Sequence, residues 1–107
     1  MPDLSINFAG INAPNPFWLA SGPPTNTAEQ VISAFRAGWG GAVWKTIGTQ
    51  VVNVSSRYAG IPFQGRKLAG MTNIELISDR SNTDNLRDIE LVKKTFPDRP
   101  VVVSLMT

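Results

Sequence analysis

Two short apolar runs on either side of a helical pattern most restrict how this chain can fold. The runs cover residues 17–20 and 40–46, and polar residues follow the apolar part of each. Between them, Thr27 and Gln30 have the spacing of a capping box. The apolar residues after this box recur at the spacing of one helix face: Ala28, Val31, Ile32 and Phe35. A strand, a helix and a strand within about thirty residues predict a βαβ unit with parallel strands.

Further elements are predicted before and after this unit. Apolar and polar residues alternate over 4–8, which predicts a strand, and residues 11–13 predict its hairpin partner. A second helix is predicted to start at 81–83 and to end before Pro97, and residues 101–105 predict a third buried strand. The apolar stripe of the second helix is expected to consist of Leu86, Ile89, Val92 and Phe96.

Residues 47–82 show no strong periodicity. Val51, Val52 and Val54 allow one short strand, and the remainder is predicted to be loop. A connection of this length is uncommon in a compact domain and often carries function. The alternative is a surface excursion or a linker.

The order of elements predicts an α/β fold: a β-hairpin followed by β-α-β-α-β. Three parallel strands leave an unpaired edge, so they make a poor closed unit. A (β/α)8 TIM barrel needs about 250 residues, and this chain has 107. We therefore interpret residues 1–107 as one partial domain, the N-terminal part of such a barrel preceded by a β-hairpin, with about three of the eight βα units.

Composition excludes several classes of function within these residues. The chain has no cysteine and no histidine, so it lacks thiol nucleophiles, histidine triads and the usual metal ligands, and no metal site is predicted. A net charge of +2 without a Lys/Arg run argues against a nucleic-acid surface. No apolar run approaches the ~20 residues of a membrane helix, and no signal peptide is evident, so a cytoplasmic location is the default expectation.

Polar residues follow two of the predicted strands. Ser21 and Gly22 come after the first, and Lys45 and Thr46 end the second. Ligands of parallel α/β proteins bind beyond the carboxyl ends of the strands, so these residues are candidates for a binding site. The alternatives are a lysine that extends into solvent at a strand end and a serine that caps a turn.

Four segments, in this order, resemble one family of flavoenzymes. They are Asn15–Thr25, Ala37–Thr46, Asn53–Arg57 and Asn73–Ser78. Together they resemble the N-terminal part of the FMN-containing half of dihydropyrimidine dehydrogenases, and in particular the FMN subunit of the bacterial NAD-dependent enzyme. Class 1 dihydroorotate dehydrogenases share the barrel and a related Ala-Ser-Gly segment. Gly22 departs from the dihydropyrimidine pattern, in which alanine is common, and leans towards the dihydroorotate pattern.

The resemblance implies a role for individual residues. Ala20, Ser21 and Gly22 would lie against FMN, and Lys45 would approach both the flavin and the substrate, with Thr46 beside it. Asn73 would bind a pyrimidine substrate through its amide, although a turn asparagine is the alternative. No catalytic residue is assigned in this chain, because the cysteine that the family uses as proton donor is absent.

The resulting functional hypothesis is a fragment of an FMN-dependent oxidoreductase that interconverts uracil or thymine and their 5,6-dihydro forms. By the resemblance, NAD and iron–sulfur clusters would belong to missing segments or to an NAD/FAD-containing electron-transfer subunit. The alternatives are a fragment of a class 1 dihydroorotate dehydrogenase and a non-catalytic remnant of a barrel. The 107-residue chain is expected to be inactive by itself. Physiological direction and oligomeric state stay open.

Overall fold

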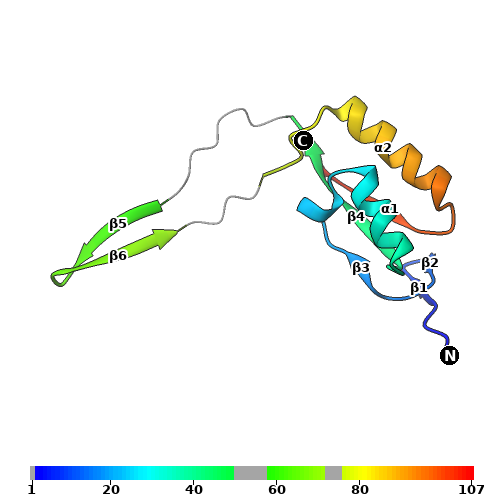
Figure 1. Cartoon of the computed structure of the whole chain (residues 1–107), viewed down its shortest axis with the longest axis horizontal. Coiled ribbons are helices and arrows are strands. Elements are labelled where there is room, and N and C mark those ends of the chain that lie inside the picture. The colour runs from blue at the N-terminus through cyan, green and yellow to red at the C-terminus, as the bar shows by residue number, and fades with distance from the viewer. Residues whose placement is uncertain (1, 50–57, 72–75) are drawn as a thin grey trace.

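A computed structural model describes residues 2–49, 58–71 and 76–107 (Figure 1). The elements follow in the order β1 (Ile6–Phe8), β2 (Ile11–Ala13), β3 (Trp18–Leu19), the short 3-10 helix η1 (Pro23–Thr25), α1 (Ala28–Arg36), β4 (Gly41–Gly48), β5 (Tyr58–Phe63), β6 (Arg66–Met71), α2 (Asn82–Thr95) and β7 (Val101–Met106).

The three predicted parallel strands form one sheet with the order β3-β4-β7. This sheet confirms the α/β class and the β-α-β-α-β order. The sheet is open in the described part of the chain, where β3 and β7 each pair on one side only. The barrel itself therefore stays a prediction, and an open three-stranded sheet is what part of a barrel would contain.

Helix α1 begins at the capping box that the sequence predicts. The Thr27 hydroxyl accepts the backbone N–H of Gln30 at 3.3 Å, while the Gln30 side chain accepts the backbone N–H of Asn26 at 3.3 Å. At the other end Gly38 adopts a φ of +106°, which L side chains rarely adopt. The backbone N–H of Trp39 then bonds the Ala34 carbonyl at 3.2 Å and closes the last turn.

Helix α2 is confirmed, but one residue of its predicted apolar stripe is wrong. Ser81 caps the helix by accepting the backbone N–H of Asp84 at 3.1 Å. Leu86 is 60% exposed, whereas the neighbouring Asn85 is fully buried. The helix is rotated so that Asn85 faces the core, where its amide accepts the indole N–H of Trp44 at 3.0 Å. A buried hydrogen bond has thus taken the place that the apolar pattern gave to leucine.

The two helices pack on the sheet through one core (Figure 1). Phe35 of α1 and Phe96, just after α2, meet edge to face with ring centroids 5.6 Å apart. The buried members of the core come from both helices and from β4: Ala28, Val31, Phe35, Ala42, Trp44, Ile47 and Val92.

Strand β4 contains an irregularity near its end. Trp44 pairs with Val103 and Ile47 pairs with Leu105, so two residues of β4 oppose one residue of β7. The two residues are Lys45 and Thr46. Trp44 and Ile47 are both buried in the core although three positions separate them, which a regular strand of period two would not permit.

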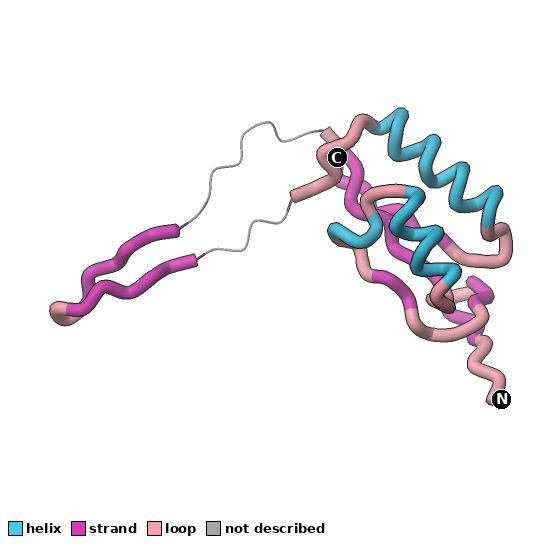
Figure 2. The backbone as a smooth tube through the Cα atoms, viewed as in Figure 1, coloured by secondary structure: helices cyan, strands magenta, loops and turns pink. Residues whose placement is uncertain are grey.

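Two hairpins complete the described structure (Figure 2). The predicted pair β1–β2 is confirmed. The second hairpin, β5–β6, lies in the region predicted to be loop, and that part of the prediction is wrong. Gln64 and Gly65 connect its strands with φ values of +48° and +72°, the left-handed turn that a two-residue hairpin requires. The possible strand at Val51–Val54 lies outside the described residues.

Two features are absent from the described ranges, a membrane-spanning helix and a cluster of metal ligands. None of their helices is both long enough and apolar enough to cross a membrane. In the same ranges, no group of three or more histidine, cysteine, aspartate or glutamate residues lies together as metal ligands do.

Candidate functional site

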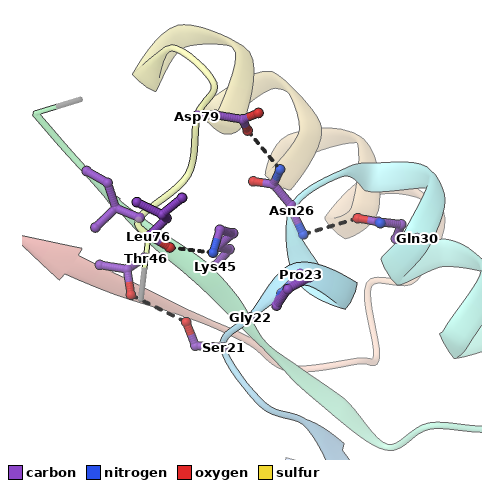
Figure 3. A pocket seen from close by; sticks show the side chains of 10 residues that line it. Ser21, Gly22, Pro23, Asn26, Gln30, Lys45, Thr46, Leu76 and Asp79 are labelled. Carbon is purple, nitrogen blue, oxygen red and sulfur yellow. Dashed lines mark hydrogen bonds between the residues drawn. The ribbon is translucent and has the colours of Figure 1, made fainter. Parts of the chain in front are cut away.

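A cleft of about 690 Å³ lies at the carboxyl ends of β3 and β4. Its walls come from the loop after β3, from η1, from the first turn of α1 and from the segment that precedes α2 (Figure 3). The lining residues are Ser21, Gly22, Pro23, Asn26, Gln30, Lys45, Thr46, Leu76, Ile77 and Asp79. Its volume falls in the range of small-molecule sites.

The structure brings four of the six predicted site residues together. Ser21 and Gly22 line one side of the cleft, and Lys45 and Thr46 line its floor. Ala20 does not line the cleft: it is exposed, and its carbonyl oxygen lies 3.4 Å from the Thr25 hydroxyl. Asn73 lies outside the described residues.

A row of hydroxyl groups crosses the sheet beside the cleft. The Ser21 hydroxyl donates to the Trp44 carbonyl at 3.0 Å and lies 3.4 Å from the Thr46 hydroxyl. The Thr46 hydroxyl lies 2.9 Å from that of Ser104 on β7. The ends of three strands are therefore joined by side chains that can both donate and accept hydrogen bonds.

Lys45 is the cation of the cleft. Its half-buried side chain donates from Nζ to the carbonyl oxygen of Leu76 at 2.5 Å (Figure 3). A neutral carbonyl oxygen accepts a hydrogen bond from the ammonium group without neutralising its positive charge, and an ammonium group has three donors. This contact therefore fixes the head group and leaves further donors for an acceptor or an anion.

Asp79 adds a carboxylate at the rim. The Asn26 side-chain amide donates to it at 3.1 Å. This hydrogen bond is the main reason why the pKa of Asp79 lies below its usual value, and the backbone N–H of Asp79 itself lowers the pKa as well. Burial acts in the opposite direction and is outweighed. The charges of Arg80 and Lys45 lower the pKa of Asp79 further. The cleft thus presents an ammonium group on its floor and an ionised carboxylate at its edge.

Gly22 is not required by crowding within the protein. Its φ is 172°, which is extended backbone that any residue adopts. A Cβ at this position would lie 3.8 Å from Cδ of Pro24, an ordinary van der Waals contact. Alanine therefore fits here as well as glycine does.

Sequence reasoning missed six residues that line the cleft: Pro23, Asn26, Gln30, Leu76, Ile77 and Asp79. Their common signal is position, since they lie in the connection after β3, in the first turn of α1 or in the segment before α2, at the same edge of the sheet. In parallel α/β folds these connections meet around the ligand.

The chain is similar in sequence to dihydropyrimidine dehydrogenases. The chain is 40% identical over 113 aligned residues to chloroplastic dihydropyrimidine dehydrogenase (NADP(+)) of Arabidopsis thaliana. It is 38% identical over 105 residues to the NAD-dependent dihydropyrimidine dehydrogenase subunit PreA of Escherichia coli. These alignments cover 98% and 97% of the chain.

The alignments cover 26% of each relative, so the chain spans about a quarter of the length of the curated relatives that it matches. No family model matches the chain. A sequence identity near 40% over almost the whole chain still exceeds what a shared fold alone would produce. The chain is therefore homologous, over nearly its whole length, to part of the dihydropyrimidine dehydrogenases.

Proposed function

We propose that this chain supplies one part of the FMN and pyrimidine site of a dihydropyrimidine dehydrogenase. In such an enzyme the substrates would be uracil or thymine and their 5,6-dihydro forms. The observation that carries the proposal is the cleft, which is lined by Lys45 and by the paired hydroxyl groups of Ser21 and Thr46. This cleft lies in a chain homologous to enzymes of that name.

The residues of the cleft suit part of a flavin. When bound, FMN supplies hydride transfer and gains negative charge along one edge of its ring system. An ammonium group that is held in place by a carbonyl oxygen can stabilise such charge, and Lys45 has this arrangement. Ser21 and Thr46 can donate to ring oxygen or nitrogen atoms, while Pro23 and Ile77 offer apolar surface. The phosphate of FMN would need groups beyond these residues, because barrels often build that site after strands 7 and 8.

The substrate contact and the partner belong to the same proposal. We infer that Asn73 binds the pyrimidine edge, since an amide matches alternating carbonyl and N–H groups. We also propose an NAD/FAD-containing electron-transfer partner for the whole enzyme, with iron–sulfur clusters outside this chain. The word "subunit" in the name of the bacterial relative supports a partner of some kind.

The dihydroorotate alternative depended on Gly22. Packing within the protein does not require glycine at this position, because alanine would fit at the same place. The remnant alternative depends on the open edges of β3 and β7, which the structure contains in the described residues.

One experiment separates these functions. The natural protein that carries these residues would be purified, loaded with FMN and mixed without oxygen with dihydrouracil, dihydrothymine or dihydroorotate. Bleaching of the flavin absorbance by the first two compounds is the expected result. Bleaching by dihydroorotate alone would move the protein to the other enzyme class. A protein that binds no FMN under these conditions would support the remnant.

A further inference from the structure

Three consecutive residues of β4 each bind a different residue of the segment 76–85. The Trp44 indole N–H donates to the Asn85 side-chain oxygen at 3.0 Å. Lys45 Nζ donates to the Leu76 carbonyl at 2.5 Å. The Thr46 carbonyl accepts the backbone N–H of Ser78 at 2.7 Å. The end of the strand that carries Lys45 is therefore bound to the segment before α2 at Leu76 and Ser78 and to α2 itself at Asn85.

Ser78 is the centre of these contacts. Its side chain is 2% exposed, and its hydroxyl donates to Asn26 Oδ1 at 2.8 Å. The same oxygen accepts a hydrogen bond from Asn85 Nδ2 at 3.1 Å and lies 3.3 Å from the backbone nitrogen of Arg80. A hydroxyl group has one proton and two lone pairs, so all three capacities are used. Loss of this oxygen would remove one hydrogen bond each from the Asn26 side-chain oxygen, Asn85 Nδ2 and the backbone N–H of Arg80.

Asn85 uses its whole amide in the same way. It is fully buried, and besides Ser78 its Nδ2 donates to the Arg80 and Ser81 carbonyls at 3.2 and 3.0 Å. The contact with Ser81 would serve α2 alone. The contacts with Trp44 and Ser78 instead connect α2 to β4 and to the segment whose Leu76 binds Lys45. The start of a helix does not require these two contacts.

We propose that Ser78 and Asn85 are positioning residues for Lys45. They hold Leu76 so that its carbonyl oxygen fixes the ammonium group in the cleft. They touch neither cofactor nor substrate in this role and act through Lys45. The inference rests on the proposed function of Lys45 at the flavin, and it names the residues that set the place of its charge.

The test uses the natural protein that carries these residues, loaded with FMN. Ser78→Ala removes the central hydroxyl. Ser81→Ala is the matched control, because it removes a hydroxyl three residues after Ser78 that caps α2 through Asp84. Hydrogen exchange of the peptide covering 76–81 is measured first. Ser78→Ala should accelerate exchange at Leu76–Asp79, while Ser81→Ala should affect the first turn of α2 instead.

The second measurement is the flavin midpoint potential in a cycle with Lys45→Met. Ser78→Ala should shift the oxidised-to-reduced equilibrium by about two- to tenfold towards the oxidised form. It should have no further effect when Lys45 is already methionine, because its influence passes through that residue. Asn85→Ala, which removes the other positioning residue and lies outside the cleft lining, is the second variant should Ser78→Ala fold poorly, and the same cycle applies to it.

The outcomes separate the two claims. If Lys45→Met lowers the potential while both Ser78→Ala and Asn85→Ala leave it unchanged, the positioning role is overturned and the proposed function stands. The role is also overturned if these variants lower the potential equally with and without Lys45. An unchanged potential in Lys45→Met with FMN still bound overturns the proposed function, and the positioning role fails with it.

Discussion

Lys45 and Leu76 lie 31 positions apart in the chain, yet Nζ of the one donates to the carbonyl oxygen of the other at 2.5 Å. The bond joins the end of β4 to the segment before α2 across the cleft. It explains why a lysine at a strand end, which ordinarily extends into solvent, is half buried here. The charge is thereby held at one place in a site where its position would matter.

Removal of that charge is the first prediction. Lys45→Met keeps most of the apolar stem and removes the ammonium group. In the FMN-loaded natural protein we expect a lower flavin reduction potential and slower reduction, because a charge contact in a partly desolvated site contributes about 1–3 kcal/mol. That corresponds to a change of roughly five- to 150-fold in the equilibrium constant. Potentiometric titration and stopped-flow reduction measure both quantities, and unchanged values would return Lys45 to the class of solvated lysines.

The second prediction compares two glycines. Gly22→Ala should change the free energy of unfolding by less than about 0.5 kcal/mol, since its Cβ would have ordinary contacts. Gly40→Ala should destabilise by about 1–3 kcal/mol, because its Cβ would lie 2.2 Å from the Asn15 carbonyl oxygen. Thermal unfolding of both variants is the measurement. Equal melting temperatures would contradict the backbone placement of Gly40.

Gly22→Ala also tests the site. If the flavin approaches this backbone closely, the substitution should weaken FMN binding although folding is unaffected. A titration of the apoprotein with FMN would show it, and unchanged affinity would indicate that the ring does not contact residue 22.

The third prediction concerns pH and the ion pair between Arg80 and Asp88. Burial acts to raise the pKa of Asp88, but donation from Arg80 at 2.5 Å and from the Ala28 N–H at 2.8 Å outweighs it, and the pKa lies below its usual value. The resulting stabilisation is fully present above the unfolded pKa of about 3.9 and is lost as the pH falls through the folded pKa.

Asp88→Asn keeps the shape and removes the charge. We expect a loss of about 1–2 kcal/mol at pH 7, the usual effect of a charged hydrogen bond in a partly exposed place. Between pH 5 and pH 2 the variant should lose less stability than the parent does. Chemical unfolding at several pH values measures the difference, and parallel pH profiles would show that the pair does not respond to acid as proposed.

The fourth prediction concerns the isolated polypeptide of residues 1–107. Among the described residues, strands β3 and β7 each have an unpaired edge, and the side chains of Phe17 and Leu105 are 63% and 70% exposed. We expect this polypeptide to self-associate or to be poorly soluble, because exposed edges and apolar surface pair with other chains. Light scattering after gel filtration gives the mass, and a monodisperse monomer with a cooperative thermal transition would contradict the expectation.

The fifth prediction is that the same polypeptide does not retain FMN. The cleft offers contacts for one side of a flavin and none of the described lining residues is a second cation for a phosphate group. The absorbance near 450 nm, a property of flavins in general, should separate from the protein peak on gel filtration. Co-elution in stoichiometric amount would mean that the binding determinants lie elsewhere.

Much of the fold followed from local patterns. The sequence predicted the Thr27 cap of α1, a start of α2 at 81–83 and the apolar strands, because caps and buried strands have short-range signatures. The hairpin β5–β6 was not, since its Gln64-Gly65 turn is a weak signal and its strands contain Gly and Pro. Asn85 was missed for a different reason: its burial depends on Trp44, 41 positions away, which no periodicity reports.

The site showed the same division. Strand-end logic found Ser21, Gly22, Lys45 and Thr46, all of which line the cleft. Leu76 and Ser78 lie in a connection at the same edge of the sheet, but the sequence pattern does not say which strand end each of them contacts. That information lies in tertiary hydrogen bonds alone.

The extra residue in β4 has a consequence for how this strand can change. With two residues opposite Ser104, the strand returns Ile47 to the core while Lys45 and Thr46 both line the cleft. Of these four consecutive residues, Trp44 and Ile47 therefore pack in the core and Lys45 and Thr46 line the cleft. Substitutions at 45 or 46 can alter the chemistry without a cavity in the core, whereas loss of one residue between Trp44 and Ile47 would turn Ile47 outwards. The strand is therefore tolerant of replacement and intolerant of deletion at the same two positions.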